Sequence, residues 1–133
     1  GTLIEEIFVA DQGNKRIQVF DLQGTYLRQF SPPLVLSGWC LNYGFGCPPN
    51  AHGTFNRLQA LDVDSMGRLH ALDIFESGVT IIDPVSGAKL GDYGMWGGGA
   101  GQLRSPLDVL VTEWNEAIVT DNNSRTMEIF VIP

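Results

Sequence analysis

The stretch VADQGNKRIQVFDLQG, residues 9–24, decides the fold. A short β-prone run ends at Asp11, a polar turn follows, and a second apolar run ends at Asp21. In that second run Ile17 and Val19 alternate with polar residues, and this period of two is typical of a strand with one buried face. The turn residues after Asp21 favour a tight reversal into a further strand. The stretch therefore predicts an antiparallel meander.

The same order of residues occurs three times in the chain. The copies are FVADQGNKRIQVF at residues 8–20, HALDIFESGVTII at residues 70–82 and IVTDNNSRTMEIF at residues 118–130. No stretch has a convincing helical period. The repeat therefore predicts an all-β protein that is built from similar units.

Each copy carries an aspartate at the end of its first apolar run, namely Asp11, Asp73 and Asp121. A carboxylate at the end of a strand accepts backbone N–H groups and fixes the turn that follows. A metal-binding or catalytic interpretation would need several such groups to converge at one place, which spacing along a repeat does not indicate. We interpret the three aspartates as repeated structural turn residues.

The spacing of the copies divides the chain into units of four strands. The segments GTFNRLQAL and GQLRSPLDV precede the second and third aspartates, and each predicts a linker followed by an inner strand. The expected divisions are the last three strands of a first unit (1–30), an insertion loop with two cysteines (31–52), a complete second unit (53–94), and a linker with the first three strands of a third unit (95–133).

This order of strands resembles the NHL repeat. NHL blades carry a glycine and proline entry, an inner strand, a strand ending in Val-Ala-Asp, and then an Arg-Ile-Gln-Val-Phe strand; residues 9–24 match this pattern closely. The resemblance covers nearly all of the chain except about residues 31–51, and it implies a β-propeller of four-stranded antiparallel blades. The second copy lacks the arginine, and the third has Thr126 where the first has Arg16. These departures weaken a shared binding role for those positions but not the fold.

Two and a half blades do not close a ring. Propellers close with roughly four to eight blades, and closure protects the edges of the sheets. We therefore expect a partial ring that is part of a larger polypeptide, or that is completed by other copies of the chain or by another subunit. The resemblance implies a ring of about six blades, which needs about twice this material.

Cys40 and Cys47 lie in the insertion, and their spacing allows a small disulfide-closed loop. Such a bond would contribute roughly 2–3 kcal/mol, mainly by ordering the insertion. A structural disulfide here would place the protein in an oxidising, extracytoplasmic compartment. The alternative is a pair of reduced thiols in a cytosolic loop.

Aromatic residues near the cysteines are candidates for partner binding. Trp39, Tyr43 and Phe45 lie on the insertion, and Trp96 precedes a glycine-rich linker. Exposed aromatic side chains dominate the binding energy of protein interfaces. The alternative is that they pack on their own blade.

Composition argues against several functions. The net charge is −7, the only lysines are Lys15 and Lys89, and the six arginines are scattered, so the basic stripe that nucleic acid requires is missing. No apolar run is long enough to insert into a membrane. His52 and His70 do not form a zinc pair, and the glycine-rich segment lacks the lysine of a phosphate-binding loop, so we expect no metal and no cofactor.

Two functions remain. We favour a non-catalytic protein-interaction or structural scaffold module, bound to a protein partner or to other subunits that complete the ring. The alternative is part of a metal-dependent lyase or hydrolase whose active site needs the missing blades. Fold alone does not separate these two.

Overall fold

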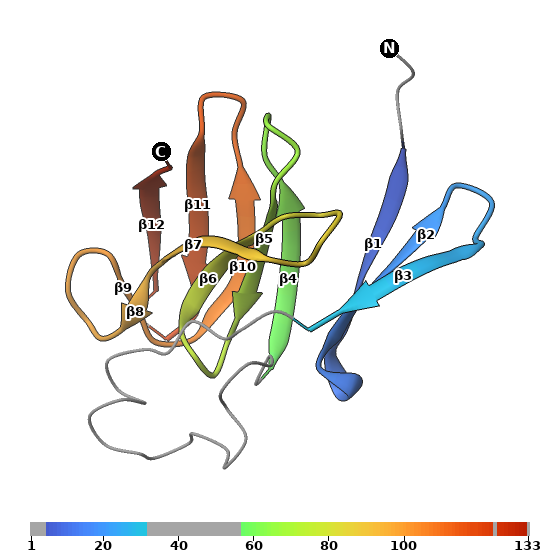
Figure 1. The fold of residues 1–133 in the computed structure, drawn as a ribbon. Coiled ribbons are helices and arrows are strands. Elements are labelled where there is room, and N and C mark those ends of the chain that lie inside the picture. The colour runs from blue at the N-terminus through green and yellow to red at the C-terminus, as the bar shows by residue number, and fades with distance from the viewer. Residues whose placement is uncertain (1–4, 32–56, 124, 133) are drawn as a thin grey trace.

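The protein has an all-β fold. In this computed structural model the described residues are 5–31, 57–123 and 125–132. Apart from a single 3₁₀ turn, η1 (Gln12–Asn14), their regular structure consists of strands (Figure 1). The insertion residues Trp39, Cys40, Tyr43, Phe45 and Cys47 lie outside the described residues, so the predicted disulfide and the partner-binding role of these aromatics stay predictions.

Three antiparallel sheets follow one another along the chain. The first sheet contains β1 (Glu6–Asp11), β2 (Arg16–Asp21) and β3 (Tyr26–Phe30). The second sheet contains β4 (Leu58–Val63), β5 (Leu69–Asp73), β6 (Gly78–Ile82) and β7 (Lys89–Tyr93). The third sheet contains β10 (Pro106–Val111), β11 (Glu116–Asp121) and β12 (Thr126–Val131). In each sheet the strands are in chain order, as in a meander.

Short polar turns reverse the chain between strands. In the turn from β4 to β5, Oδ1 of Asp64 accepts hydrogen bonds from the backbone N–H groups of Met66 (2.9 Å) and Arg68 (3.0 Å). Gly67 in the same turn has φ +82°, a left-handed conformation that favours glycine. Aspartate and glycine are therefore what allow the tight reversal that the strand pairing requires.

The core lies between the sheets. One cluster joins Ile17 of the first sheet to Leu69 and Ile82 of the second. A second cluster joins Val79 of the second sheet to Val119 of the third and to their apolar neighbours. Both faces of the second sheet are thus covered, which explains why every residue of β5 and β6 is buried.

The first strands of the second and third sheets lie side by side. Oδ2 of Asp62 on β4 accepts a hydrogen bond of 2.6 Å from the backbone N–H of Val111 on β10. The linker between these sheets contains the short parallel pair β8 (Met95–Trp96) and β9 (Gln102–Leu103). Successive sheets that pack face to face around adjacent first strands are arranged as blades are in a β-propeller.

Candidate functional site

Asp73 and Asp121 have the same geometry in successive sheets. The Asp73 carboxylate accepts hydrogen bonds from the backbone N–H groups of Arg57 (3.0 Å), Phe75 (3.1 Å) and Glu76 (3.2 Å). The Asp121 carboxylate accepts them from Ser105 (3.1 Å) and Asn123 (3.1 Å), which are equivalent to Arg57 and Phe75, and also from Arg104 (2.6 Å). Both aspartates are buried, and each ties the entry of its sheet to the turn after the second strand.

Asp11 is bonded differently. Its carboxylate accepts a hydrogen bond from Nε of Arg16 (2.7 Å) and another from Nδ2 of Asn14 (3.0 Å). The hydrogen bond from Arg16 is the main cause that lowers the pKa of Asp11, and the hydrogen bond from Asn14 lowers it further. The described bonds of the Asp11 carboxylate therefore come from the turn residue Asn14 and from Arg16 at the start of β2.

A chain of hydrogen-bonded side chains joins the second sheet to its first turn. Its members are Arg68, Asp64, His70 and Tyr93, and we call it the relay. Nε2 of His70 lies 2.9 Å from Oδ2 of Asp64, and Nδ1 lies 2.8 Å from the hydroxyl of Tyr93. Nε of Arg68 donates to the same Asp64 oxygen at 2.7 Å. With Asp64 ionised, a neutral His70 that carries its proton on Nε2 satisfies every one of these groups. His70 and the side chain of Asp64 have no exposed surface, whereas Arg68 is partly exposed.

The pKa values of the relay follow from burial. Burial lowers the pKa of His70 and outweighs the effect of Asp64. Burial alone would raise the pKa of Asp64, but the hydrogen bonds from His70 and Arg68 lower it overall. Burial also raises the pKa of Tyr93. These directions favour an ionised Asp64, which forms an ion pair with Arg68, beside a neutral His70 and a neutral Tyr93.

The third sheet has an open apolar face. Met127 and Ile129 on β12 occupy the repeat positions that Val79 and Ile81 occupy on β6. Met127 and Ile129 are 59% and 57% exposed, whereas Val79 and Ile81 are 0% and 4% exposed. Leu110, Met127, Ile129 and Val131 are exposed on this side of the sheet, and we call them the open face of the third sheet.

The first sheet has the complementary open face. Ile7 and Val9 on β1 are 43% and 40% exposed, while the equivalent Leu69 and Ala71 on β5 are fully buried against the first sheet. Ile7 and Val9 form the open face of the first sheet. Each end of the stack thus exposes positions that are buried wherever another sheet is present.

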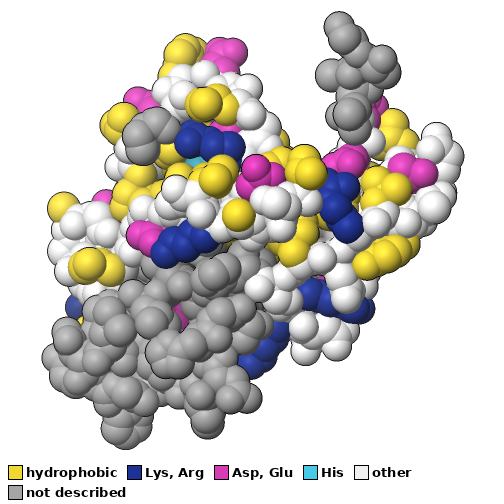
Figure 2. Space-filling view, viewed as in Figure 1, with side chains coloured by type: hydrophobic (Ala, Val, Ile, Leu, Met, Phe, Trp, Pro, Cys, Tyr) yellow, Lys and Arg dark blue, Asp and Glu magenta, His cyan; other side chains and the backbone are white. Residues whose placement is uncertain are grey.

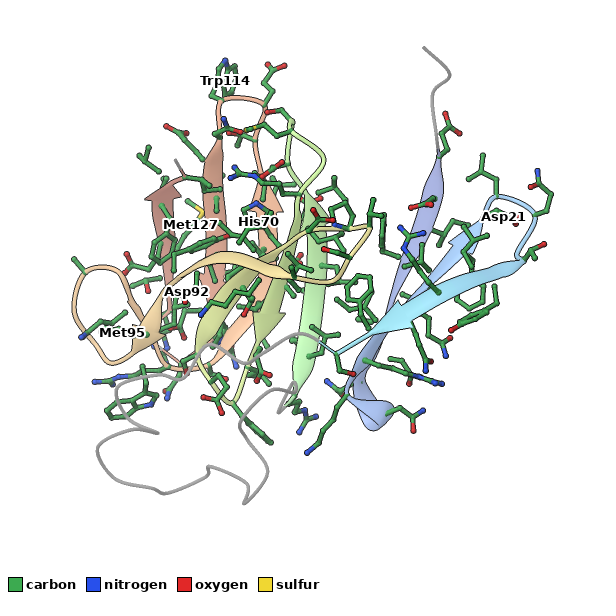
Figure 3. All side chains as sticks on the ribbon, in the orientation of Figure 1. Asp21, His70, Asp92, Met95, Trp114 and Met127 are labelled. Carbon is green, nitrogen blue, oxygen red and sulfur yellow. The ribbon has the colours of Figure 1, made fainter. Side chains whose placement is uncertain are left out.

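An exposed tryptophan marks one end of the sheets. Trp114 is 74% exposed on the turn from β10 to β11 and projects from the molecule, as Figure 3 shows. Oγ of Ser65 hydrogen-bonds Oδ1 of Asn115 at 3.0 Å, which joins this turn to the one that carries the exposed Met66. Two large apolar side chains are therefore held at the tips of adjacent turns.

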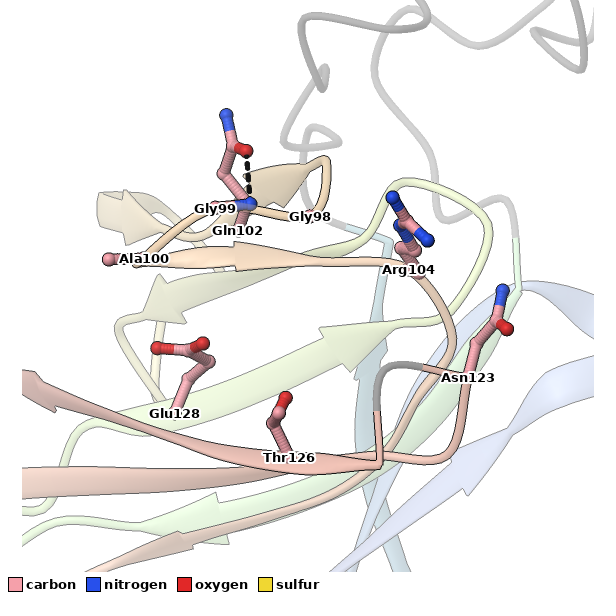
Figure 4. Close-up of a pocket in the computed structure, with 8 residues that line it drawn as sticks. All are labelled: Gly98, Gly99, Ala100, Gln102, Arg104, Asn123, Thr126 and Glu128. Carbon is pink, nitrogen blue, oxygen red and sulfur yellow. Dashed lines mark hydrogen bonds between the residues drawn. The ribbon is translucent and has the colours of Figure 1, made fainter.

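A polar hollow lies between the linker and the third sheet (Figure 4). It has a volume of about 370 Å³. Its lining comes from Gly98, Gly99, Ala100, Gln102, Arg104, Asn123, Thr126 and Glu128.

Trp96 is the one predicted partner-binding residue that the structure describes. It lies on β8 and is 41% exposed. Across the described ranges, no three histidine, cysteine, aspartate or glutamate side chains group as metal ligands do. No helix in those ranges is long and apolar enough to cross a membrane. On the visible face, lysine and arginine side chains form small separate groups rather than a continuous stripe (Figure 2).

Reasoning from the sequence missed the relay, Trp114 and the hollow, and it expected exposed faces between blades without identifying their residues. Aligning the copies signals the relay, because His70 stands where the other copies have Phe8 and Ile118. No signal in the repeat identifies the hollow, since its walls come from segments about twenty residues apart that meet only in the folded chain.

No family model matches the chain, and no curated protein matches it. Among solved structures, the chain is similar to Kuenenia stuttgartiensis hydrazine synthase, with a TM-score of 0.62 and 11% identity over 95% of this chain. It is also similar to a Bacteroides uniformis protein assigned as a 6-phosphogluconolactonase, with a TM-score of 0.46 and 14% identity over 98% of this chain. The chain spans 29% and 40% of those two chains. The first likeness concerns the fold alone, and it supports the β-propeller architecture.

Proposed function

We propose that the chain is a non-catalytic interaction or scaffold module made of NHL-type propeller blades. Its two open faces pack against further sheets of the same repeat. The observation that carries this proposal is the exposure of Met127 and Ile129 at positions that are buried in both preceding copies. Fully burying a large apolar side chain is worth roughly 1.5–3 kcal/mol, so a covering sheet would be strongly favoured.

The two open faces are the two halves of one kind of interface. Between the first and second sheets, the side of β2 that carries Ile17 packs against the side of β5 that carries Leu69. The open face with Ile129 is equivalent to the first half, and the open face with Ile7 is equivalent to the second. A head-to-tail contact of this kind generates a ring if the rotation closes and a filament if it does not.

Polar contacts set the register of such packing. Nη2 of Arg28 on β3 donates to the backbone oxygen of Pro84 in the second sheet at 2.6 Å, and Arg28 also pairs with Glu6. Gln12 donates from Nε2 to the backbone oxygen of Leu58 at 3.1 Å. These contacts support a defined docking geometry between successive sheets rather than nonspecific hydrophobic association.

The partner is a protein or another copy of the chain, and the net charge of −7 is unfavourable for nucleic acid. We place the protein in an extracytoplasmic compartment on the basis of Cys40 and Cys47. We also propose that the complete ring has about six blades. No cofactor is part of this proposal.

The sedimentation behaviour of the whole protein tests the proposal. Ile129→Glu places a charge on the open face of the third sheet, and Val85→Glu is the control at an exposed apolar position on the β6–β7 turn. If separate subunits complete the ring, we expect Ile129→Glu to dissociate the assembly. If one longer polypeptide forms the ring, we expect Ile129→Glu to make that polypeptide less compact. Val85→Glu should change the sedimentation in neither case. Equal behaviour of the two variants and the wild type would contradict the proposal.

A further inference from the structure

The polar hollow combines charges of both signs. Glu128 lies at one end, Arg104 and Asn123 lie at the other, and Thr126 lies between them (Figure 4). Its volume of about 370 Å³ falls in the range of small-molecule sites, which is about 300–1,000 Å³. Its lining is dominated by polar groups, so a polar ligand fits it better than an apolar one.

The backbone of Arg104 is held in place by the fold, and its side chain is exposed. Its backbone N–H donates to the buried carboxylate of Asp121, which fixes the end of β9 against the end of β11. Its guanidinium lies against Gly98, where a Cβ atom would come within 2.5 Å of Nη2. Within the described residues, no hydrogen bond or ion pair engages that guanidinium. Glycine at position 98 thus leaves space for the Arg104 guanidinium, which is available to a ligand.

Among the described residues, Glu128 is anchored through one carboxylate oxygen. Oε2 accepts a hydrogen bond of 3.2 Å from the backbone N–H of Gly101. Oε1 has no partner among the described residues, and the same holds for the side chains of Thr126 and Asn123. The Glu128 carboxylate and the Thr126 hydroxyl therefore line the same hollow as the Arg104 guanidinium, and the Asn123 amide lies at the guanidinium end.

We propose that this hollow binds a small zwitterion of the amino-acid type, either a free amino acid or a peptide of a few residues. The ligand carboxylate pairs with the guanidinium of Arg104, whose planar fork suits a carboxylate. The ligand ammonium pairs with Oε1 of Glu128. Thr126 hydrogen-bonds the atoms between the two charges, and Asn123 hydrogen-bonds the ligand carboxylate beside Arg104.

This site is separate from the packing of further sheets. Residues alternate along β12, so Thr126 and Glu128 share the side of Phe130, which packs toward the second sheet. Met127 and Ile129 lie on the opposite side. A sheet that packs on the open face would contact the side of β12 opposite to the hollow, and either proposal can fail without the other.

Ligand-observed NMR and titration of the whole protein test the site, with diglycine, N-acetylglycine and glycinamide as probes. N-acetylglycine lacks the ammonium, and glycinamide lacks the carboxylate. We expect saturable binding of diglycine, with both capped probes weaker by about tenfold or more because each loses a charge-assisted bond. No saturable binding of diglycine, or equal binding of the three probes, would overturn the proposal.

Variants assign the binding to these residues. Arg104→Gln and Glu128→Gln should each weaken diglycine binding by about tenfold or more. Arg125→Gln and Glu113→Gln are the matched controls, since both are exposed and neither lines the hollow. All four changes are at accessible side chains, and the thermal unfolding of each variant verifies its fold. Equal weakening by Arg104→Gln and Arg125→Gln would show a general charge effect and contradict the site.

Discussion

Val79 and Met127 occupy the same position in successive copies of the repeat, six residues after the turn aspartate of each copy, yet Val79 is fully buried and Met127 is 59% exposed. The difference comes from the surroundings, because Val79 contacts a following sheet and Met127 does not. Contiguous exposed apolar residues often mark interaction surfaces, and this is the basis of our proposal that a further sheet covers the open face.

Two matched substitutions measure this difference. Ile81→Ala removes a buried side chain and should lower the free energy of unfolding by about 2–5 kcal/mol. Ile129→Ala should cost less than about 1 kcal/mol if the open face is bare, and as much as Ile81→Ala if the face is covered. Our proposal predicts the second result for the assembled protein. Urea denaturation over a range of protein concentrations provides the measurement.

The turn aspartates should differ in their contribution to stability. Asp73→Ala and Asp121→Ala each leave several backbone N–H groups without their acceptor, so each should cost about 3 kcal/mol or more. Asp11→Ala breaks bonds to accessible side chains and should be milder. Chemical denaturation of the three variants provides the comparison. A loss for Asp11→Ala as large as that for Asp73→Ala would show that Asp11 has a structural role that its contacts do not explain.

The buried relay predicts a pH-dependent stability. A histidine in the unfolded chain takes up a proton near pH 6.5, but burial lowers the pKa of folded His70. The unfolded state therefore binds more protons in this range, and stability should fall as the pH decreases from about 6.5 toward the folded pKa.

A double variant isolates the contribution of the relay. The first sheet carries Phe8 and Phe30 at the positions of His70 and Tyr93. His70→Phe combined with Tyr93→Phe should fold, since Arg68 still pairs with Asp64. Its stability should depend less on pH between about 5 and 7 than that of the wild type. Parallel curves for the two proteins would mean that His70 does not cause the loss.

The all-β class could be predicted because the repeat determines it locally. Ile17 and Val19 alternate with polar residues, and the structure contains a strand at Arg16–Asp21. Asp11, Asp73 and Asp121 each end a strand in the structure. Such features depend on neighbours within a few residues, so they can be predicted from the local sequence pattern.

The functional surfaces could not be predicted in the same way. The bond from His70 to Tyr93 joins residues that are 23 apart, and its burial depends on Phe130, which packs on Tyr93 from the third sheet. The exposure of Met127 depends on which sheet follows it in space, and residue type alone does not encode that. Features that arise from packing between sheets become visible only when the sheets are assembled.

Thiol labelling of the native protein tests the central claim most directly. Cysteine is placed singly at positions 81, 129 and 85, and its reaction rate at each is read by peptide mass spectrometry, which separates these sites from Cys40 and Cys47. Position 81 is buried and position 85 is exposed, so they set the two limits. The proposal predicts that Ile129→Cys is protected nearly as well as Ile81→Cys, because a further sheet covers it. Labelling of Ile129→Cys as fast as that of Val85→Cys would contradict the proposal.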